Sequence, residues 1–168
     1  MGNNNSSDNT QDNEQINKRT KVNETATIAI PIEQTFLTTD YMLSRKDTTF
    51  KYVLIPLEEE NAMPENSENG KYIMSLIGNE TDNQIVIPFD YIELHLNNIG
   101  TSTYIVKQLI EEEKEHFIYD TQQYYITVKT NYNSNNKFVA DTIVKNDAGL
   151  LVSIIDFCNE YNDDVTDK

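Results

Sequence analysis

The stretch TATIAIPIEQTF, residues 25–36, alternates between apolar side chains and others with a period of two. Ile28, Ile30 and Ile32 share one face, because successive side chains of an extended strand point to opposite sides. This alternation predicts a half-buried β-strand. No long segment with the 3.6-residue period of an amphipathic helix competes with it, so the stretch indicates an all-β protein.

Several further runs have the same character, with turn-forming residues between them. They are TTFKYVLIPL (48–57), KYIMSLIG (71–78), NQIVIPFDYIELHL (83–96), TSTYIVKQLI (101–110), YDTQQYYITVKTNY (119–132), KFVADTIVKN (137–146) and LLVSIIDFCNEY (150–161). Together they predict an antiparallel β-sandwich of about seven to nine strands. The residues expected to fill or border its core are Tyr104, Tyr119, Tyr124, Phe89, Phe157, Ile87, Val106, Ile126 and Val128.

The chain of 168 residues is long enough for one domain with a hydrophobic core. Residues 1–22 are polar, rich in asparagine and nearly free of large apolar side chains. Such a segment buries too little surface to offset its ordering entropy, so it is predicted to be a disordered leader. The β-sandwich domain is expected over residues 23–162, and residues 163–168 are expected to form a flexible tail.

The composition excludes several classes of partner and site. A net charge of −15 argues against binding nucleic acid or an anionic membrane. The sequence has no run of about 20 apolar residues, so we do not expect this chain to insert into a membrane. We also recognise no secretion signal or anchor in it. Cys158 is the only cysteine, and neither His95 nor His116 belongs to a spaced ligand pattern. We therefore expect no metal, no cofactor and no catalytic residue.

Acidic residues occur in runs at 58–60, 111–113 and 163–164. Consecutive carboxylates lack the staggered spacing of a calcium loop, so we interpret these runs as solvated loops. A hydrolase that uses two carboxylates brought together in space remains an alternative, although the sequence singles out no pair.

One polar residue stands where the strand pattern expects an apolar one. In IIDFCNEY, residues 154–161, Asn159 has the same parity as Ile155 and Phe157 and should therefore point inward. A buried amide without partners costs roughly 1–3 kcal/mol. Asn159 is thus expected to be buried and hydrogen-bonded.

Four stretches, taken in order, resemble the isopeptide-linkage domain of Gram-positive major pilins, including streptococcal ones. TFKYVLIPL is similar to an F-x-F/Y-x-L strand, and IPFDYIELHLNNIGTSTYIVKQ to an I-x-F strand followed by an aliphatic strand, a glycine turn and Y-x-I-x-E. YDTQQYYITVKTNY is similar to Y-D-x-x-x-Y-x-V-x-V, and DFCNEY to F-x-N-x-Y. The resemblance extends from about Thr25 to Tyr161 and rests on the order and spacing of the motifs.

The resemblance implies an immunoglobulin-like sandwich with a structural, non-enzymatic role in a bacterial cell-surface or pilus-like protein. Its place would be extracellular, in the cell wall or a pilus, and its partners would be neighbouring domains or subunits of a fibre. Many such domains form a bond between a lysine of the first strand and an asparagine of the last. A buried neutral amine attacks the carboxamide, a protonated carboxylic acid assists, and ammonia leaves.

Only one of the three residues of that site is present in this sequence. The asparagine corresponds to Asn159, whereas Gln108 replaces the acid and Ile32 replaces the lysine. Glutamine does not titrate at neutral pH and isoleucine is no nucleophile, so the resemblance implies a degenerate site without an isopeptide bond. Ile32, Gln108 and Asn159 are expected to lie together in the core, with the two amides hydrogen-bonded to each other.

Other readings of these residues stay open. The first strand could be misaligned, with Lys21, Lys46 or Lys51 as the true donor. Asn159 could also be a strand-end amide that serves a neighbouring loop. The alternative function is an adhesin module that binds a host protein or glycan through its loops, for which an exposed aromatic patch is needed. The tyrosines at positions 41, 72 and 132 are its candidates.

Overall fold

The structure is a computed structural model that describes residues 19–40, 43–44, 47–79 and 87–164. Over these residues it contains strands and no α-helix, which confirms the predicted all-β class. The strands are β1 (Thr20–Thr38), β2 (Thr49–Pro56), β3 (Tyr72–Ile77), β4 (Phe89–Leu109), β5 (Phe117–Ile118), β6 (Gln123–Tyr132), β7 (Phe138–Lys145), β8 (Leu151–Val152) and β9 (Ile155–Tyr161).

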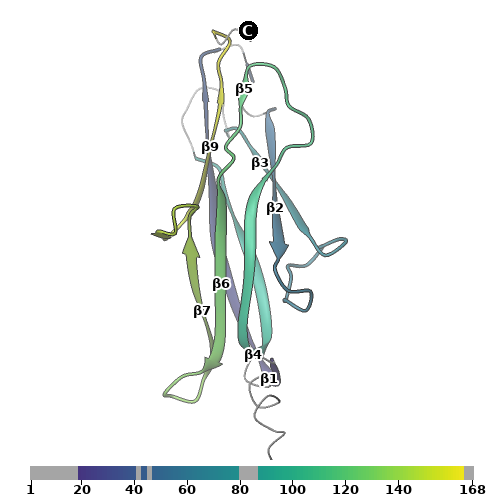
Figure 1. The fold of residues 1–168 in the computed structure, drawn as a ribbon, viewed down its shortest axis with the longest axis vertical. Coiled ribbons are helices and arrows are strands. Elements are labelled where there is room, and N and C mark those ends of the chain that lie inside the picture. The colour runs from purple at the N-terminus through teal and green to yellow at the C-terminus, as the bar shows by residue number, and fades with distance from the viewer. Residues whose placement is uncertain (1–18, 41–42, 45–46, 80–86, 165–168) are drawn as a thin grey trace, which may run out of the picture.

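The long strand β4 connects two groups of strands, and the molecule is correspondingly elongated (Figure 1). Its first half, up to Ile99, pairs with β1, and β1 pairs in turn with β9. Its second half, from Gly100 onward, pairs with β6 on one side and with β2 on the other. The sheet order is β5-β9-β1-β4-β6-β7-β8, and β3 extends the branch formed by β2.

The pairing of the first strand with the last departs from the predicted purely antiparallel sandwich. β1 and β9 run parallel, with Ile32 opposite Ile155 and Phe36 opposite Asn159. The direction follows from the chain path, because β8 already runs in the direction of β1. β9 keeps that direction after the two-residue break at Ser153–Ile154 and exchanges β7 for β1 as its neighbour. The fold is therefore a curled, mixed sheet.

Both groups of strands contribute to one hydrophobic core. Across it, the rings of Tyr52 and Phe157 lie 4.5 Å apart, and those of Phe36 and Phe50 lie 5.0 Å apart. Full burial of one such side chain contributes about 1.5–3 kcal/mol. The core cluster comprises Ile30, Ile32, Phe36, Phe50, Tyr52, Leu54, Met74, Leu76, Ile92, Leu94, Leu96, Tyr104, Val106, Tyr124, Ile126, Val128, Val144, Ile155 and Phe157.

Most of the nine expected core residues are buried, but two predictions were wrong. Phe89 is 62% exposed and Ile87 is 45% exposed. In the first half of β4 the inward residues are Ile92, Leu94 and Leu96, so Phe89 has the outward parity. Tyr119 is partly buried and packs against the core, and the remaining six are buried: Tyr104, Tyr124, Phe157, Val106, Ile126 and Val128.

The beginning of β1 lies inside the segment predicted to be a leader. The strand starts at Thr20, so residues 20–22 are part of the sheet, and residues 1–18 lie outside the described residues. Of the predicted tail, residues 165–168 likewise lie outside them. Gly100 has a φ of +151° and passes close to Arg19, whose Cγ would be 3.1 Å from an added Cβ. A glycine at this point lets β4 pass against the start of β1.

Candidate functional site: two buried polar clusters

Asn159 is fully buried on the inner face of β9, as its parity predicts. Its Nδ2 donates a hydrogen bond of 3.0 Å to the hydroxyl of Tyr52. Its Oδ1 accepts one of 3.0 Å from the backbone N–H of Asp120. Both ends of the amide are therefore hydrogen-bonded without any charged side chain, which removes the cost of its burial.

Tyr52 links Asn159 to the first strand. Its hydroxyl donates a short hydrogen bond to the Oε1 of Gln34, and the Nε2 of Gln34 donates to the carbonyl of Ile77 at 2.8 Å. Gln34, Tyr52 and Asn159 are each fully buried, and we call them the amide cluster. The amide cluster connects β1, β2 and β9 across the core by hydrogen bonds alone.

The chemistry of the amide cluster is that of neutral groups. Burial raises the pKa of the Tyr52 hydroxyl above its ordinary value, and the hydrogen bond from Asn159 opposes that shift only in part. The phenol therefore stays protonated at neutral pH and is a poor nucleophile. Carboxamides do not titrate in this range. The arrangement can hold strands together, but its own side chains provide neither a base nor a nucleophile.

The segment between β5 and β6 lies along the edge of β9 that faces away from β1. Besides the bond from its N–H to Asn159, Asp120 accepts a hydrogen bond of 2.9 Å at Oδ2 from the N–H of Cys158. The hydroxyl of Tyr124 bonds to the carbonyl of Asp156. These groups take the places that a further strand would fill, so the edge of β9 beside the amide cluster is capped.

The three residues predicted to form the site are all buried but are not assembled as expected. Ile32 lies opposite Ile155, four residues before the position opposite Asn159, which is about 13 Å along the strand. Gln34 takes the expected place of Ile32 as the first-strand residue that reaches Asn159, through Tyr52.

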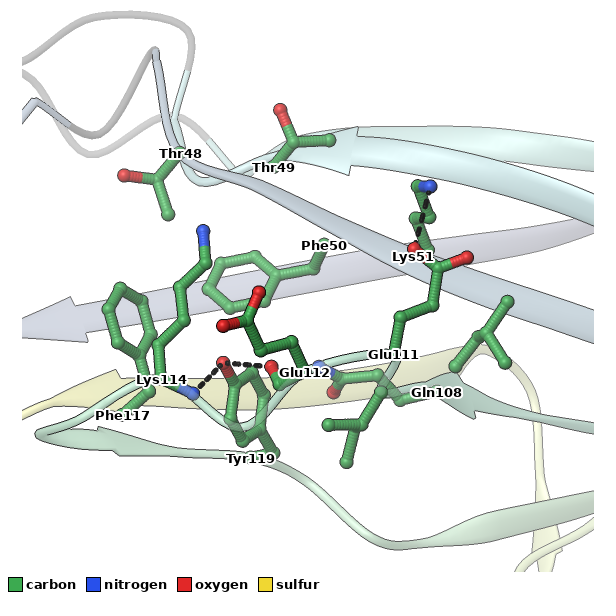
Figure 2. A pocket seen from close by; sticks show the side chains of 12 residues that line it. Thr48, Thr49, Phe50, Lys51, Gln108, Glu111, Glu112, Lys114, Phe117 and Tyr119 are labelled. Atoms are coloured by element: carbon green, nitrogen blue, oxygen red, sulfur yellow. Dashed lines mark hydrogen bonds and ion pairs between the residues drawn. The ribbon is translucent and has the colours of Figure 1, made fainter.

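Gln108 does not form the expected amide pair with Asn159. Its backbone lies opposite Tyr52, and its side chain lines a cavity of about 230 Å³ together with Phe50, Phe117 and Tyr119. Figure 2 shows Gln108 extending from β4 toward Tyr119 in this cavity. The Oε1 of Gln108 is buried and has no hydrogen-bond partner among the described residues.

Sequence reasoning missed Gln34 as a partner, although the signal was present. Gln34 shares the parity of Ile30, Ile32 and Phe36 in the same strand, and all four are buried. The argument applied to Asn159, a polar residue on an apolar face, applies to Gln34 without change. Gln34 and Asn159 are both amides on inward faces, and their strands β1 and β9 are neighbours in the sheet, so these two residues together mark the cluster.

A second buried polar site, here called the arginine cluster, lies at the start of β1. The side chain of Arg19 is 11% exposed and forms an ion pair of 3.0 Å with Glu58. It also bonds to the Oδ1 of Asn61, whose Nδ2 donates to the carbonyl of Thr103 at 2.6 Å. The cluster thus fixes the beginning of β1 to the loop after β2 and to β4.

None of the alternative lysines serves Asn159 among the described residues. Lys21 is exposed on β1, and Lys51 is half-exposed and paired with Glu111 at 3.1 Å, as Figure 2 shows. Lys46 lies outside the described residues. Cys158 is on the outer face of β9, where partial burial and nearby carboxylates raise the pKa of its thiol.

Other kinds of site are limited in the part of the chain that the structure describes. No group of three or more His, Cys, Asp or Glu side chains could hold a metal ion there. No helix in the same ranges has the length and hydropathy of a membrane span. Of the tyrosines expected to form a patch, Tyr72 and Tyr132 are partly buried, and residue 41 lies outside the described ranges.

Comparison with solved structures finds major pilins of Streptococcus pyogenes. The major pilin matches with a TM-score of 0.52 and 16% identity, over 81% of this chain and 50% of the pilin. A mutant of it gives 0.54 and 15% over the same shares, and the T-13 major pilin protein of that species gives 0.53 and 17% over 82% and 53%. The chain thus spans about half the length of these pilins, and identities this low show a pilin-like fold alone. No family model and no curated protein matches the chain.

Proposed function

We propose that this chain is a non-enzymatic structural domain of a bacterial cell-surface or pilus-like protein. The observation that carries the proposal is the amide cluster, which ties the first strand to the last inside a pilin-like fold. In this proposal the domain is extracellular, in a cell wall or pilus, and its partners are neighbouring domains or subunits of the same fibre. We interpret its curled sheet as a variant of the immunoglobulin-like sandwich.

The proposal includes a degenerate isopeptide site that forms no intramolecular bond. Amide-bond formation needs an amine, whereas Asn159 donates to the Tyr52 hydroxyl and accepts from the backbone N–H of Asp120. We assign Ile32, Gln108 and Asn159 to this degenerate site because they correspond to its three positions in the family motif. Gln34 is the first-strand residue that is linked to Asn159, where the family has its lysine. Hydrogen bonding and packing then hold the two terminal strands.

Mechanical unfolding tests this structural role. A single domain pulled from residue 20 and residue 164 should release the full contour length of the chain between these points, because no covalent bond shortens it. If the segment between the first and last strands never extends, a covalent link is present and the proposal is wrong. A variant with cysteines at positions 36 and 159, which lie opposite each other in the pairing of β1 with β9, provides the shortened reference when it is oxidised to a disulfide.

A second candidate function, an adhesin module, is favoured by one observation. A groove of about 260 Å³ lies where the loop after β2 meets the outer face of β4, and it is lined by Tyr72, Tyr91, Glu65 and Glu93 among others. Tyrosine rings are enriched at recognition surfaces. Loss of binding to a surface ligand on substitution of Tyr91 would support this function, and a scaffold role alone predicts no such ligand.

A further inference from the structure

The groove beneath the loop after β2 has a simple construction. Pro64, Glu65 and Asn66 form one wall and Tyr72, the first residue of β3, borders it. The opposite wall is the outer face of the first half of β4, the part of β4 that pairs with β1, whereas β2 and β6 pair with β4 only from Gly100 onward. The volume of about 260 Å³ suits the end of one side chain or a small organic molecule.

The face of β4 supplies three aligned side chains. Tyr91, Glu93 and His95 are spaced by two residues and point outward, opposite in parity to the buried Ile92 and Leu94. Tyr91 is 50% exposed, and its ring forms a T-shaped contact with that of Phe89, with 5.9 Å between the two ring centroids. That contact limits the movement of the Tyr91 ring and leaves ring surface open to solvent.

Two carboxylates line the groove, and one of them, that of Glu93, is paired with His95. Glu65 and Glu93 line it, and of the described residues in its lining none is lysine or arginine. His95 is engaged at both nitrogens, since Nε2 lies 2.9 Å from Glu93 Oε1 and Nδ1 lies 3.0 Å from Thr27 Oγ1. A carboxylate only accepts, so in the neutral ring Nε2 carries the hydrogen. The net charge of −15 adds a field that attracts cations.

We propose that this groove binds a cationic group, a guanidinium or an ammonium, with its face on Tyr91 or Tyr72 and its hydrogens toward Glu65 and Glu93. Rings attract cations through their quadrupole, and carboxylates form charge-assisted hydrogen bonds with them. The same carboxylates repel an anionic ligand. The cation can belong to an arginine or lysine of a partner protein or to a free polyamine. This inference specifies the ligand of the adhesin candidate and is independent of the structural role.

Titration followed by amide NMR tests the proposal. The probes are agmatine, the peptide acetyl-Gly-Arg-Gly-amide and the peptide acetyl-Gly-citrulline-Gly-amide, whose citrulline side chain has the shape of arginine and whose blocked ends leave it without charge. Agmatine or the arginine peptide should give saturable shifts at residues of the groove, weakened by added salt. The citrulline peptide should give none. A response to agmatine alone identifies a small-molecule site, and a response to the peptide identifies a protein partner.

Substitutions locate the binding. Tyr91→Ala and Glu93→Gln should each weaken binding by about 2- to 5-fold or more, the range of one exposed cation–π or ionic contact. Tyr125→Ala and Glu113→Gln are matched controls on exposed residues outside the groove and should leave it unchanged.

Three results would overturn the proposal. They are equal shifts with the citrulline peptide, an equal loss of affinity in the control variants, or no saturable shift at groove residues with any cationic probe. Binding of a neutral oligosaccharide that requires Tyr91 would assign the groove to sugars and would overturn it as well. The contour length released on pulling is unaffected by all of these outcomes, so the two proposals fail separately.

Discussion

The amide cluster and the arginine cluster hold the two ends of the same strand by different physics. Gln34, near the end of β1, is fully buried with Tyr52 and Asn159, and all three groups are neutral. Arg19, just before β1, is charged and pairs with Glu58, whose side chain is 46% exposed. In the fully buried amide cluster a hydrogen bond is strong and its loss is costly, whereas the ion pair of Arg19 with Glu58 is screened by water and salt on the half-exposed side of Glu58.

The two clusters contribute differently to the role proposed for the domain. The first and last strands of the sheet meet at the amide cluster, so its hydrogen bonds resist their separation. The arginine cluster instead fixes the path of the chain as it enters the sheet. In the proposed structural role, in which no covalent link joins the two strands, the domain depends on the amide cluster more than on the arginine cluster.

The largest effect is expected from removing the amide of the last strand. Asn159→Ala leaves the Tyr52 hydroxyl bonded only to Gln34, leaves the Asp120 N–H without its acceptor and opens a cavity, so unfolding should require roughly 2–4 kcal/mol less. Urea denaturation measures the loss. Asn135→Ala, in the exposed turn before β7, is the control and should change stability by less than about 0.5 kcal/mol. Equal effects of the two substitutions would show that the amide cluster contributes nothing.

Removing the hydroxyl of Tyr52 should have a somewhat smaller effect than removing the amide of Asn159, because Tyr52→Phe keeps the aromatic ring in the core. Tyr52→Phe leaves Gln34 Oε1 and Asn159 Nδ2 each without one partner, which should cost roughly 1–3 kcal/mol. Thermal or urea unfolding provides the value. A cost below about 0.5 kcal/mol would mean that water or another group satisfies both amides.

Alkaline pH should destabilise the protein through the tyrosines of both regions. Burial raises the pKa of Tyr104, which bonds to the carbonyl of Ala62 near the arginine cluster, to about 12, and burial raises that of Tyr52 as well. Both pKa values lie above the unfolded value of about 10. Their contribution is complete below pH 10 and is lost as the pH rises toward 12.

Urea midpoints measured from pH 7 to pH 11.5 should therefore stay constant at first and then fall. Tyr104→Phe removes one titrating group, so the midpoint of this variant should fall less steeply above pH 10. Parallel curves for the variant and the original chain would contradict the assignment.

The smallest effect is expected at the exposed end of the arginine cluster. Glu58→Gln removes one half-exposed charge and should cost less than about 1 kcal/mol at low salt. The cost should disappear in about 1 M NaCl, where screening is nearly complete. Glu59→Gln, at the neighbouring exposed position, serves as the control. A salt-independent cost would indicate that Glu58 acts through packing.

The strand faces were predictable because burial follows the period of two. Ile32, Phe157 and Asn159 were placed on inward faces from sequence alone, and all three are fully buried. Periodicity also placed Phe89 inward, which was wrong. Near Phe89 both parities carry large side chains, Phe89 and Tyr91 on one and Ile92 and Leu94 on the other, so periodicity alone does not reveal which face meets the core.

The register between paired strands and the identity of each strand's neighbour could not be predicted in the same way. Alternation is unchanged when a strand slides by two residues, so it cannot decide whether Ile32 or Gln34 stands nearest to Asn159. It also cannot reveal that β1 and β9 run parallel, which depends on the whole chain path. The register between β1 and β9 explains why Gln34, and not Ile32, is linked to Asn159.

The intact mass of the purified chain tests the central claim, a noncovalent tie between the first and last strands, most directly. Formation of an amide bond between a lysine and Asn159 would release one ammonia. We predict the full mass of the sequence and, after proteolysis, separate unlinked peptides that contain Gln34 and Asn159. A mass lower by one ammonia, with a linked peptide that contains Asn159, would contradict the account.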